Sequence, residues 1–239
     1  MTIPNTTSSP ATLFYSEAPA DGSRAYTNIN ADPATGVRDT NVIPVEHNDV
    51  PIENLRGKEH TVTLDTAGFQ FGRASQKYTA FTDDAEIERE YYPESIELVK
   101  KITGASRIVP FDHTIRRRRP GEIDDSPQKR QPVPRVHVDQ TKQSAIARVN
   151  RHLPETDAPE LLKHRFQIIN LWRPINVPAW DWPLALCDYR SIDEKKDLLP
   201  TALVYPDREG ETLSVRYNPN HKWKYLKGME PDEFVLIKW

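Results

Sequence analysis

The sequence contains one cysteine, two methionines and nine glycines among 239 residues. Cys187 has no partner for an internal disulfide, so we expect a packed, unreactive thiol in a reducing compartment. No glycine-rich phosphate loop and no internal repeat occurs. No apolar run approaches the ~18 residues that cross a bilayer, and the first residues lack the basic and apolar regions of a secretion signal. These absences predict a soluble, cytoplasmic protein without a membrane partner.

The sequence also lacks a large excess of either charge, since its 32 basic and 35 acidic residues give a formal net charge of -3. This balance offers no overall attraction to nucleic acid. Four consecutive arginines, Arg116–Arg119, are the one feature that favours such a partner. No second basic cluster or aromatic platform accompanies them. We therefore predict no nucleic-acid partner, and interpret the block as a solvated strand end or an anion clamp over a pocket.

Length and local composition favour one domain preceded by an arm. Residues 1–50 are rich in Thr, Asn, Asp, Ala and Pro with only short apolar islands, which predicts an extended N-terminal arm. Residues 51–239 are long enough to bury one sizeable core. We expect them to form a single domain.

A few helices and many short strands are expected within that domain. Pro93–Thr103 has apolar residues at helical spacing, lysines in its last turn and Gly104 as a stop. Further helices are expected over Lys142–His152 and Pro159–Lys163. The expected strands are short apolar or alternating runs, namely His60–Leu64, Arg107–Arg116, Val133–Asp139, Phe166–Trp172, Leu184–Cys187, Thr201–Tyr205, Thr212–Tyr217, Lys222–Leu226 and Glu233–Trp239. This pattern predicts a mainly β (α+β) fold, a barrel or jelly roll with flanking N-terminal helices.

The sharpest chemical signal is the triplet His137-Val138-Asp139. Alternate residues of a strand project to one face, so His137 and Asp139 aim an imidazole and a carboxylate at one point. Two histidines and one carboxylate on one face of Fe(II) leave positions free for cosubstrate and dioxygen. The triplet supplies two of those three ligands. A histidine beside a carboxylate also suits general acid–base catalysis.

Candidate substrate-pocket residues lie in two later segments. Asn170 and Trp172 share one face of the strand expected at 166–172, and they offer a hydrogen-bonding amide and a flat wall. Arg173 lies on the other face, and pocket and scaffold roles remain open for all three residues. Trp182 precedes the apolar run PLALC, where it could form a lid or simply pack.

Several ordered blocks together resemble a known family: HTVTLDTAGFQF, HVDQT, RFQIINLWRPI, DWPLALCDYRSID, YPDREGETLSVRYNPNHKWKY and EPDEFVLIK. They are similar to the fungal hydroxylase/desaturase family that includes gibberellin desaturase-like and cephalosporin 7α-methoxylase-like proteins. The resemblance runs from about residue 40 to the end. It implies a double-stranded β-helix, the tailoring of a natural-product intermediate, Fe(II) and 2-oxoglutarate as cofactors, and His137 and Asp139 as the first two iron ligands.

The chain departs from that family at its end. In the family, the strand resembling EFVLIK leads to a distal histidine and then to an Arg-x-Ser motif that holds the cosubstrate carboxylate, whereas this chain stops at Trp239. His221 could complete a metal site as a substitute, although a turn histidine in a hairpin is the simpler interpretation. An unpaired strand at Glu233–Trp239 would leave an edge for association, which predicts a homo-oligomer such as a dimer.

Three hypotheses follow for the function. The first, which the sequence favours, is a non-oxidative isomerase, cyclase or dehydratase that needs no cofactor, with His137 and Asp139 as an acid–base pair. The second is a genuine oxygenase that uses Fe(II) and 2-oxoglutarate, with His221 completing the site. The third is a non-catalytic partner subunit.

Overall fold

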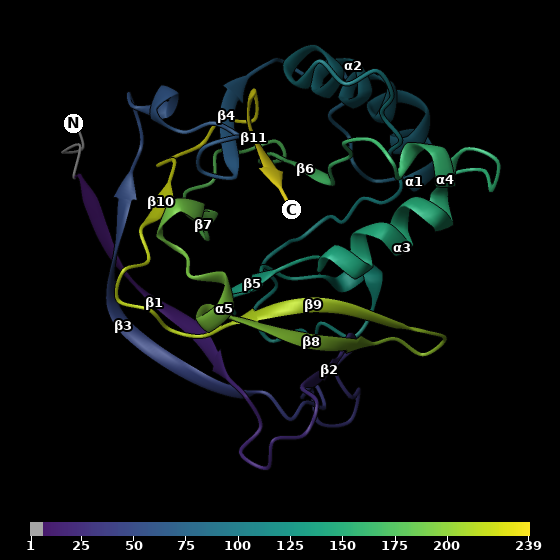
Figure 1. Cartoon of the computed structure of the whole chain (residues 1–239). Coiled ribbons are helices and arrows are strands. Elements are labelled where there is room, and N and C mark those ends of the chain that lie inside the picture. Colours follow the sequence, from purple (N-terminus) through teal and green to yellow (C-terminus); the bar gives the residue numbers. More distant parts are fainter. Residues whose placement is uncertain (1–6) are drawn as a thin grey trace.

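The computed structural model describes residues 7–239, and strands dominate it (Figure 1). The strands are β1 (Ser8–Glu17), β2 (Tyr26–Asn28), β3 (Ile43–Asn54), β4 (Phe69–Arg73), β5 (His137–Val138), β6 (Ile169–Trp172), β7 (Ala185–Cys187), β8 (Leu198–Val204), β9 (Glu209–Val215), β10 (Trp223–Tyr225) and β11 (Glu233–Lys238). They form three sheets with the strand orders β1-β3-β10-β7, β4-β11-β6 and β2-β8-β9-β5. The expectation of a mainly β fold is confirmed.

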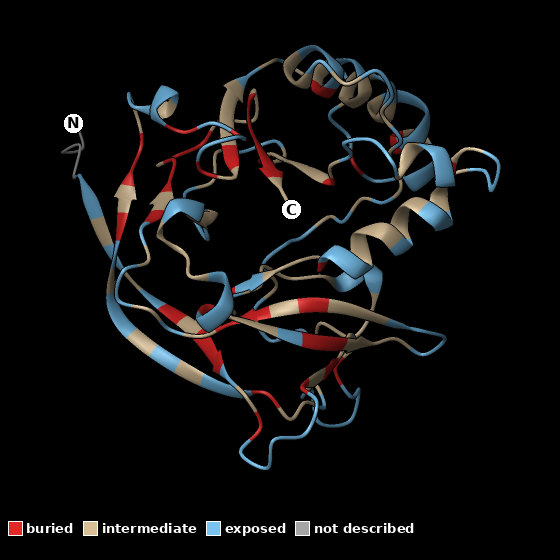
Figure 2. Cartoon of the chain, in the orientation of Figure 1, coloured by how far each residue is buried: buried red, intermediate tan, exposed pale blue. Residues whose placement is uncertain are grey.

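The last strand, β11, is the centre of its sheet. It pairs antiparallel with β4 on one side and with β6 on the other, for example through Val235, which lies opposite both Phe71 and Trp172. Val235 and Leu236 have no exposed surface, and Figure 2 shows most of β11 as buried. The expectation of an unpaired edge strand is wrong because β4 and β6 occupy both edges. Because both edges of β11 are paired, it has no free edge through which a second copy could associate.

Residues 8–54 are part of the sheets rather than an arm outside the core. β1 pairs antiparallel with β3 along its whole length, and β10 continues that sheet in parallel with the end of β3. Tyr15 on β1 is completely buried. The compositional prediction of an arm misses this because the outer face of the β1–β3 pair is polar and faces solvent. Residues 1–6 of the expected arm lie outside the described residues.

The helices are α1 (Asp84–Glu86), a π-helical turn (Ile87–Tyr91), α2 (Tyr92–Thr103), α3 (Lys142–His152), α4 (Ala158–Leu161) and α5 (Glu194–Asp197), with 3-10 turns at Glu59–Thr61, Pro127–Lys129 and Tyr189–Ser191. α1 to α4 gather along one side of the sheets, whereas α5 directly precedes β8 (Figure 1). α2 ends where Gly104 adopts a left-handed conformation with φ 70°. α3 begins where the Thr141 hydroxyl accepts a hydrogen bond from the Ser144 amide. No helix within residues 7–239 is long and apolar enough to span a membrane.

Two expected strands are absent. A 3-10 turn at Glu59–Thr61 replaces the strand expected at His60–Leu64, and the stretch Arg107–Arg116 runs as irregular chain. Their apolar residues pack without strand pairing: Val62 joins the core around Phe69, and Ile108 packs beside Val99 of α2. An apolar pattern in a short segment does not show whether the segment pairs with another strand.

Candidate functional site

The short strand β5 carries the site at the edge of its sheet. His137 lies opposite Ser214 of β9, and the Thr212 hydroxyl donates to the carbonyl of Val138. Val136 and Val138 on either side of His137 pack into the apolar cluster around Tyr15 and Trp223. Burial of these valines fixes the opposite face of the strand, so His137 and Asp139 project away from the cluster.

His137 and Asp139 meet as the sequence predicts, with 3.0 Å between His137 Nε2 and Asp139 Oδ1. The other ring nitrogen, Nδ1, lies 2.7 Å from the carbonyl oxygen of Arg135 and donates to it. This bond leaves Nε2 as the ring nitrogen that faces Asp139. A proton that Nε2 donates to the carboxylate, or a cation that both atoms bind, holds the two atoms at this separation.

Two further side chains act on Asp139. Asn170 Nδ2, on β6, donates to Asp139 Oδ2 at 2.9 Å, which leaves Oδ1 facing His137. Burial on its own would raise the pKa of Asp139, but the His137 and Asn170 hydrogen bonds and the charges of His137 and Arg116 lower it below its usual range. Asp139 is therefore a carboxylate at neutral pH. The sequence suggested Asn170 as a pocket residue but gave no sign of its contact with Asp139, since β5 and β6 belong to different sheets.

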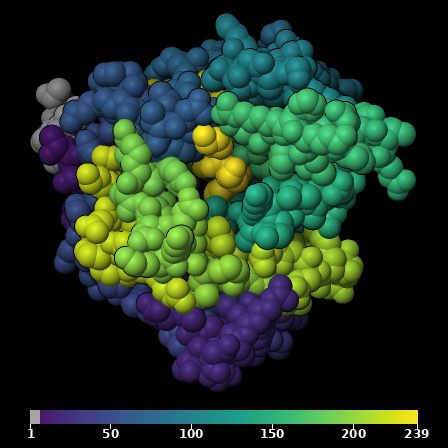
Figure 3. Space-filling view, viewed as in Figure 1, coloured from purple at the N-terminus to yellow at the C-terminus, as the bar shows by residue number. Residues whose placement is uncertain are grey.

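Asp139 lines a hollow, and His137 beside it is also accessible. The side chains of His137 and Asp139 are 33% and 37% exposed. A cavity of about 80 Å³ borders Asp139 and continues between α3 and the β8–β9 hairpin. Figure 3 shows a recess in the centre of this face, beside the yellow C-terminal residues.

His221 lies elsewhere and does not complete the site. Its Nδ1 is 3.1 Å from the Tyr15 hydroxyl and its Nε2 is 3.0 Å from Asp197 Oδ2, so both ring nitrogens have partners. The side chains of His221 and Asp197 are 2% and 3% exposed. Within residues 7–239 no three His, Cys, Asp or Glu side chains gather as a metal site. The structure thus contradicts the expectation of His221 as a third ligand, because its hydrogen bonds fix it in the core.

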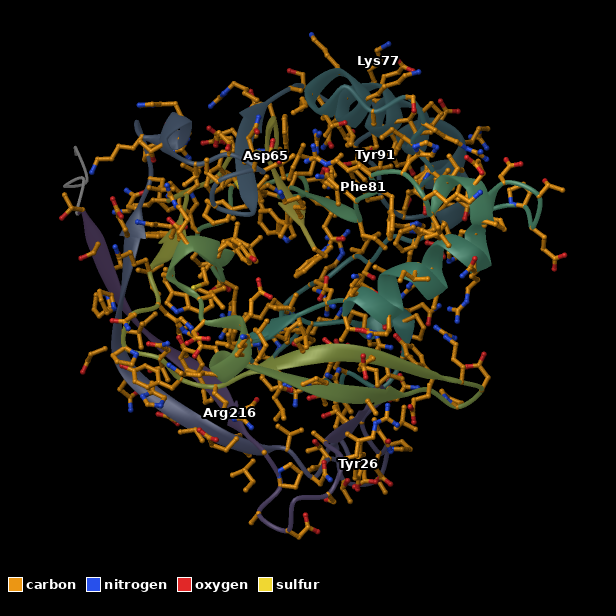
Figure 4. All side chains as sticks on the ribbon, viewed as in Figure 1. Tyr26, Asp65, Lys77, Phe81, Tyr91 and Arg216 are labelled. Atoms are coloured by element: carbon orange, nitrogen blue, oxygen red, sulfur yellow. The ribbon has the colours of Figure 1, made fainter. Side chains whose placement is uncertain are left out.

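Of the other predicted pocket residues, Trp172 and Arg173 have structural contacts, whereas Trp182 lines a cavity. Trp172 packs against the core cluster that contains Phe69 and Val235, which is a scaffold position. Arg173 donates to the carbonyl of Ala74 at 3.2 Å, and its guanidinium lies over the rings of Tyr91 and Phe234. These contacts tie β6 to the helical side, where Figure 4 labels Tyr91 beside Phe81.

Trp182 alone of this group lines a second, larger cavity of about 430 Å³, whose wall includes residues 131–134. Burial chiefly raises the pKa of Cys187 to about 11, in line with the expectation of a packed thiol.

Comparison with known proteins places the chain in a family. The family model described as an oxidoreductase/YMDC permease-like domain matches residues 13–239. This chain belongs to that oxidoreductase family. The hydroxylase/desaturase efuI of Hormonema carpetanum is 35% identical over 210 residues, which cover 79% of this chain and 70% of efuI. The Fe(II)/2-oxoglutarate-dependent dioxygenase nvfI of Aspergillus novofumigatus is 32% identical over 197 residues, covering 79% of this chain and 68% of nvfI.

Solved structures that are similar to this chain confirm the fold. A tryptophan-to-phenylalanine variant of the iron and alpha-ketoglutarate-dependent endoperoxidase NvfI superposes with a TM-score of 0.82 at 26% identity, covering 99% of this chain and 85% of the variant. The double-stranded β-helix and the resemblance to fungal hydroxylase/desaturase proteins are both confirmed. The matches span 64 to 70% of the length of the curated relatives.

These relatives overturn one expectation. The sequence led us to expect that no cofactor is required, but relatives of this chain are named as dependent on Fe(II) and 2-oxoglutarate, or on iron and alpha-ketoglutarate. The error came from the end of the chain at Trp239, and the relatives are longer than this chain. The expected isomerase, cyclase or dehydratase activity has no counterpart in the relatives' names, which are those of oxidoreductases.

The residues around Asp139 fit a bound iron ion. Imidazole nitrogen and carboxylate oxygen form a donor set that Fe(II) favours. The Arg135 carbonyl holds the His137 tautomer, and Asn170 occupies Oδ2, so that each ligand presents one atom to the same point. Such outer hydrogen bonds are the usual support of metal ligands.

Proposed function

We propose that this chain forms part of an oxidoreductase that uses Fe(II) and 2-oxoglutarate to tailor a small-molecule natural product in a fungus. The observation that carries the proposal is the 3.0 Å approach of His137 Nε2 and Asp139 Oδ1 in an accessible hollow, with His137 Nδ1 already donating to the Arg135 carbonyl. The names of relatives at 30 to 32% identity, which give Fe(II)/2-oxoglutarate or alpha-ketoglutarate dependence, support the choice of iron and cosubstrate.

The chain's own residues have separate tasks in this proposal. His137 and Asp139 provide two ligands, and Asn170 keeps Asp139 binding through a single oxygen. Arg116 places a positive charge near the carboxylate and keeps it ionised. The iron, with 2-oxoglutarate and dioxygen, supplies the oxidising power when it is bound. The fungal source and the natural-product role rest on the fungal relatives.

The test is 2-oxoglutarate turnover by purified protein that is loaded with Fe(II) under argon and then exposed to air. We expect succinate to form with oxygen uptake, and we expect His137→Ala to lower its rate to that of free iron. His164→Ala is the matched control because His164 also faces a carboxylate, with 3.4 Å between its Nε2 and Glu160 Oε1, but lies exposed on the surface. Equal succinate formation by His137→Ala and the native protein would contradict the proposal, as would no succinate from the native protein.

A further inference from the structure

The larger cavity, which we call the Trp182 cavity, has the size of a small-molecule site. Its volume is about 430 Å³, within the range of roughly 300–1,000 Å³ that ligand pockets occupy. Apolar walls and a few charged groups line it, as is typical of such pockets. The lining side chains that matter here are Arg38, Arg118, Trp182, Pro132, Val133 and Pro134.

The charged groups around the Trp182 cavity leave positive charge uncompensated. Asp124 Oδ2 lies 3.1 Å from Arg38 Nη2, and Asp124 Oδ1 lies 2.9 Å from Arg130 Nη1. One carboxylate therefore forms ion pairs with two guanidinium groups. Arg118 has a single ion pair, to Asp181 at 2.9 Å, and that pair is exposed. Among the described residues, Arg116 forms no ion pair, and its hydrogen bond is to the Gln131 carbonyl at 2.9 Å. An anionic ligand would offset this excess.

Trp182 supplies a flat wall in an unusual backbone conformation. Its φ is 58°, a region that bulky residues seldom adopt, and 46% of the residue is exposed. The neighbouring ion pair between Asp181 and Arg118 ties this segment to the arginine block. Residues held in seldom-populated backbone conformations cluster at active sites and ligand sites. A planar ring system stacks well on an indole face.

The wall of the Trp182 cavity is linked to the metal-binding pair along the chain. Pro134 in this wall precedes His137 by three residues. Gln131, which also lines the cavity, accepts a hydrogen bond from Arg116 through its carbonyl at 2.9 Å.

We propose that the Trp182 cavity binds a flat aromatic or conjugated carboxylate, with Arg118 and Arg38 facing the carboxylate and Trp182 stacking on the ring system. Its role as the substrate of the reaction rests on the proposed function above. Binding itself needs neither iron nor turnover. The two claims can therefore fail separately.

The experiment is isothermal titration of the full metal-free chain with 2-naphthoate, a flat carboxylate, and with 2-naphthamide, its neutral counterpart. We expect saturable binding of the acid at one site and binding of the amide at least about tenfold weaker, since a charge-assisted hydrogen bond is lost. Arg118→Gln and Trp182→Ala should each weaken the binding of 2-naphthoate by about tenfold or more. Arg118→Lys should keep part of the affinity because it keeps the charge.

Arg107→Gln is the matched control. The Arg107 and Arg118 side chains are 45% and 51% exposed, and each has one short ion pair, 2.8 Å to Asp157 for Arg107. The control should leave naphthoate affinity within about twofold of the native value. Equal affinity for acid and amide, an equal loss in both arginine variants, or no saturable binding would overturn the proposal. Displacement of naphthoate by 2-oxoglutarate would also overturn it, because the cavity would then be a cosubstrate site.

Discussion

Replacing His221 tests whether this histidine stabilises the core or binds metal. In the structure it joins β1 to α5: Nδ1 faces the Tyr15 hydroxyl at 3.1 Å, and Nε2 faces Asp197 Oδ2 at 3.0 Å. Trp223 Nε1 also donates to the Tyr15 hydroxyl at 2.8 Å, so this hydroxyl donates its own hydrogen to His221. His221→Ala removes the acceptor of a completely buried phenol and one partner of a buried carboxylate.

The cost follows from these contacts. A hydrogen bond to a charged group contributes about 1.5–3 kcal/mol, and a buried donor left without a partner costs about 1–3 kcal/mol. Asp197 keeps hydrogen bonds from the Asp193 amide and from Asn218. We therefore expect His221→Ala to lower the free energy of unfolding by about 3–5 kcal/mol, the usual range for breaking a buried pair.

Urea unfolding, followed by the fluorescence of the five tryptophans, measures this change. His47→Ala is the control, since His47 stacks on Tyr217 with ring centroids 3.6 Å apart. Loss of this stacking should lower the free energy of unfolding by only about 1 kcal/mol. Titration with Fe(II) under argon completes the assay, and the affinity of folded His221→Ala should equal that of the native chain. Native-like stability together with lost metal affinity would show that His221 is a metal ligand and that our placement of it is wrong.

Three further predictions concern pH, metal support and packing. Burial would raise the pKa of Asp197, but hydrogen bonds from Asp193, Asn218 and His221 outweigh it and lower that pKa. The carboxylate therefore stabilises the fold fully above about pH 4, and this contribution is lost as the pH falls below that value. The urea midpoint of Asp197→Asn should change less with falling pH than the midpoint of the native chain. Asn170→Ala should weaken Fe(II) affinity about 10–100-fold in an anaerobic titration while the melting temperature stays within a few degrees, and a native affinity would rule out the role given to this amide. Gly72→Ala places a Cβ 2.3 Å from the Phe234 ring and should cost about 1–3 kcal/mol in urea unfolding, more than Gly210→Ala, whose Cβ would lie 3.4 Å from its nearest neighbour.

Local sequence signals predicted the parts of the fold that local interactions determine. Helix α3 has the predicted bounds Lys142–His152 because its capping threonine directly precedes it. The long strands β1 and β3 were missed, since only one face of each is buried and much of β3 is polar. The central position of β11 could not be read from its apolar run, because a run of buried residues does not show which strands lie beside it.

The same distinction applies to the site. The meeting of His137 and Asp139 follows from strand alternation within three residues. Asn170 reaches Asp139 from a strand of another sheet, and the approach of Arg116 depends on how an irregular segment packs. His221 has a sequence separation compatible with a ligand, yet its contacts with Tyr15 and Asp197 come from tertiary packing alone.

Metal binding by the purified chain tests the central claim most directly. The measurement is an anaerobic calorimetric titration with Fe(II) of the native chain, His137→Ala, Asp139→Ala and the surface control His164→Ala. We predict one ion per native chain and per His164→Ala chain, and an affinity at least about 100-fold lower in each of the other two variants. Unchanged Fe(II) affinity in His137→Ala and Asp139→Ala, or no binding by the native chain, would contradict an iron site at this pair.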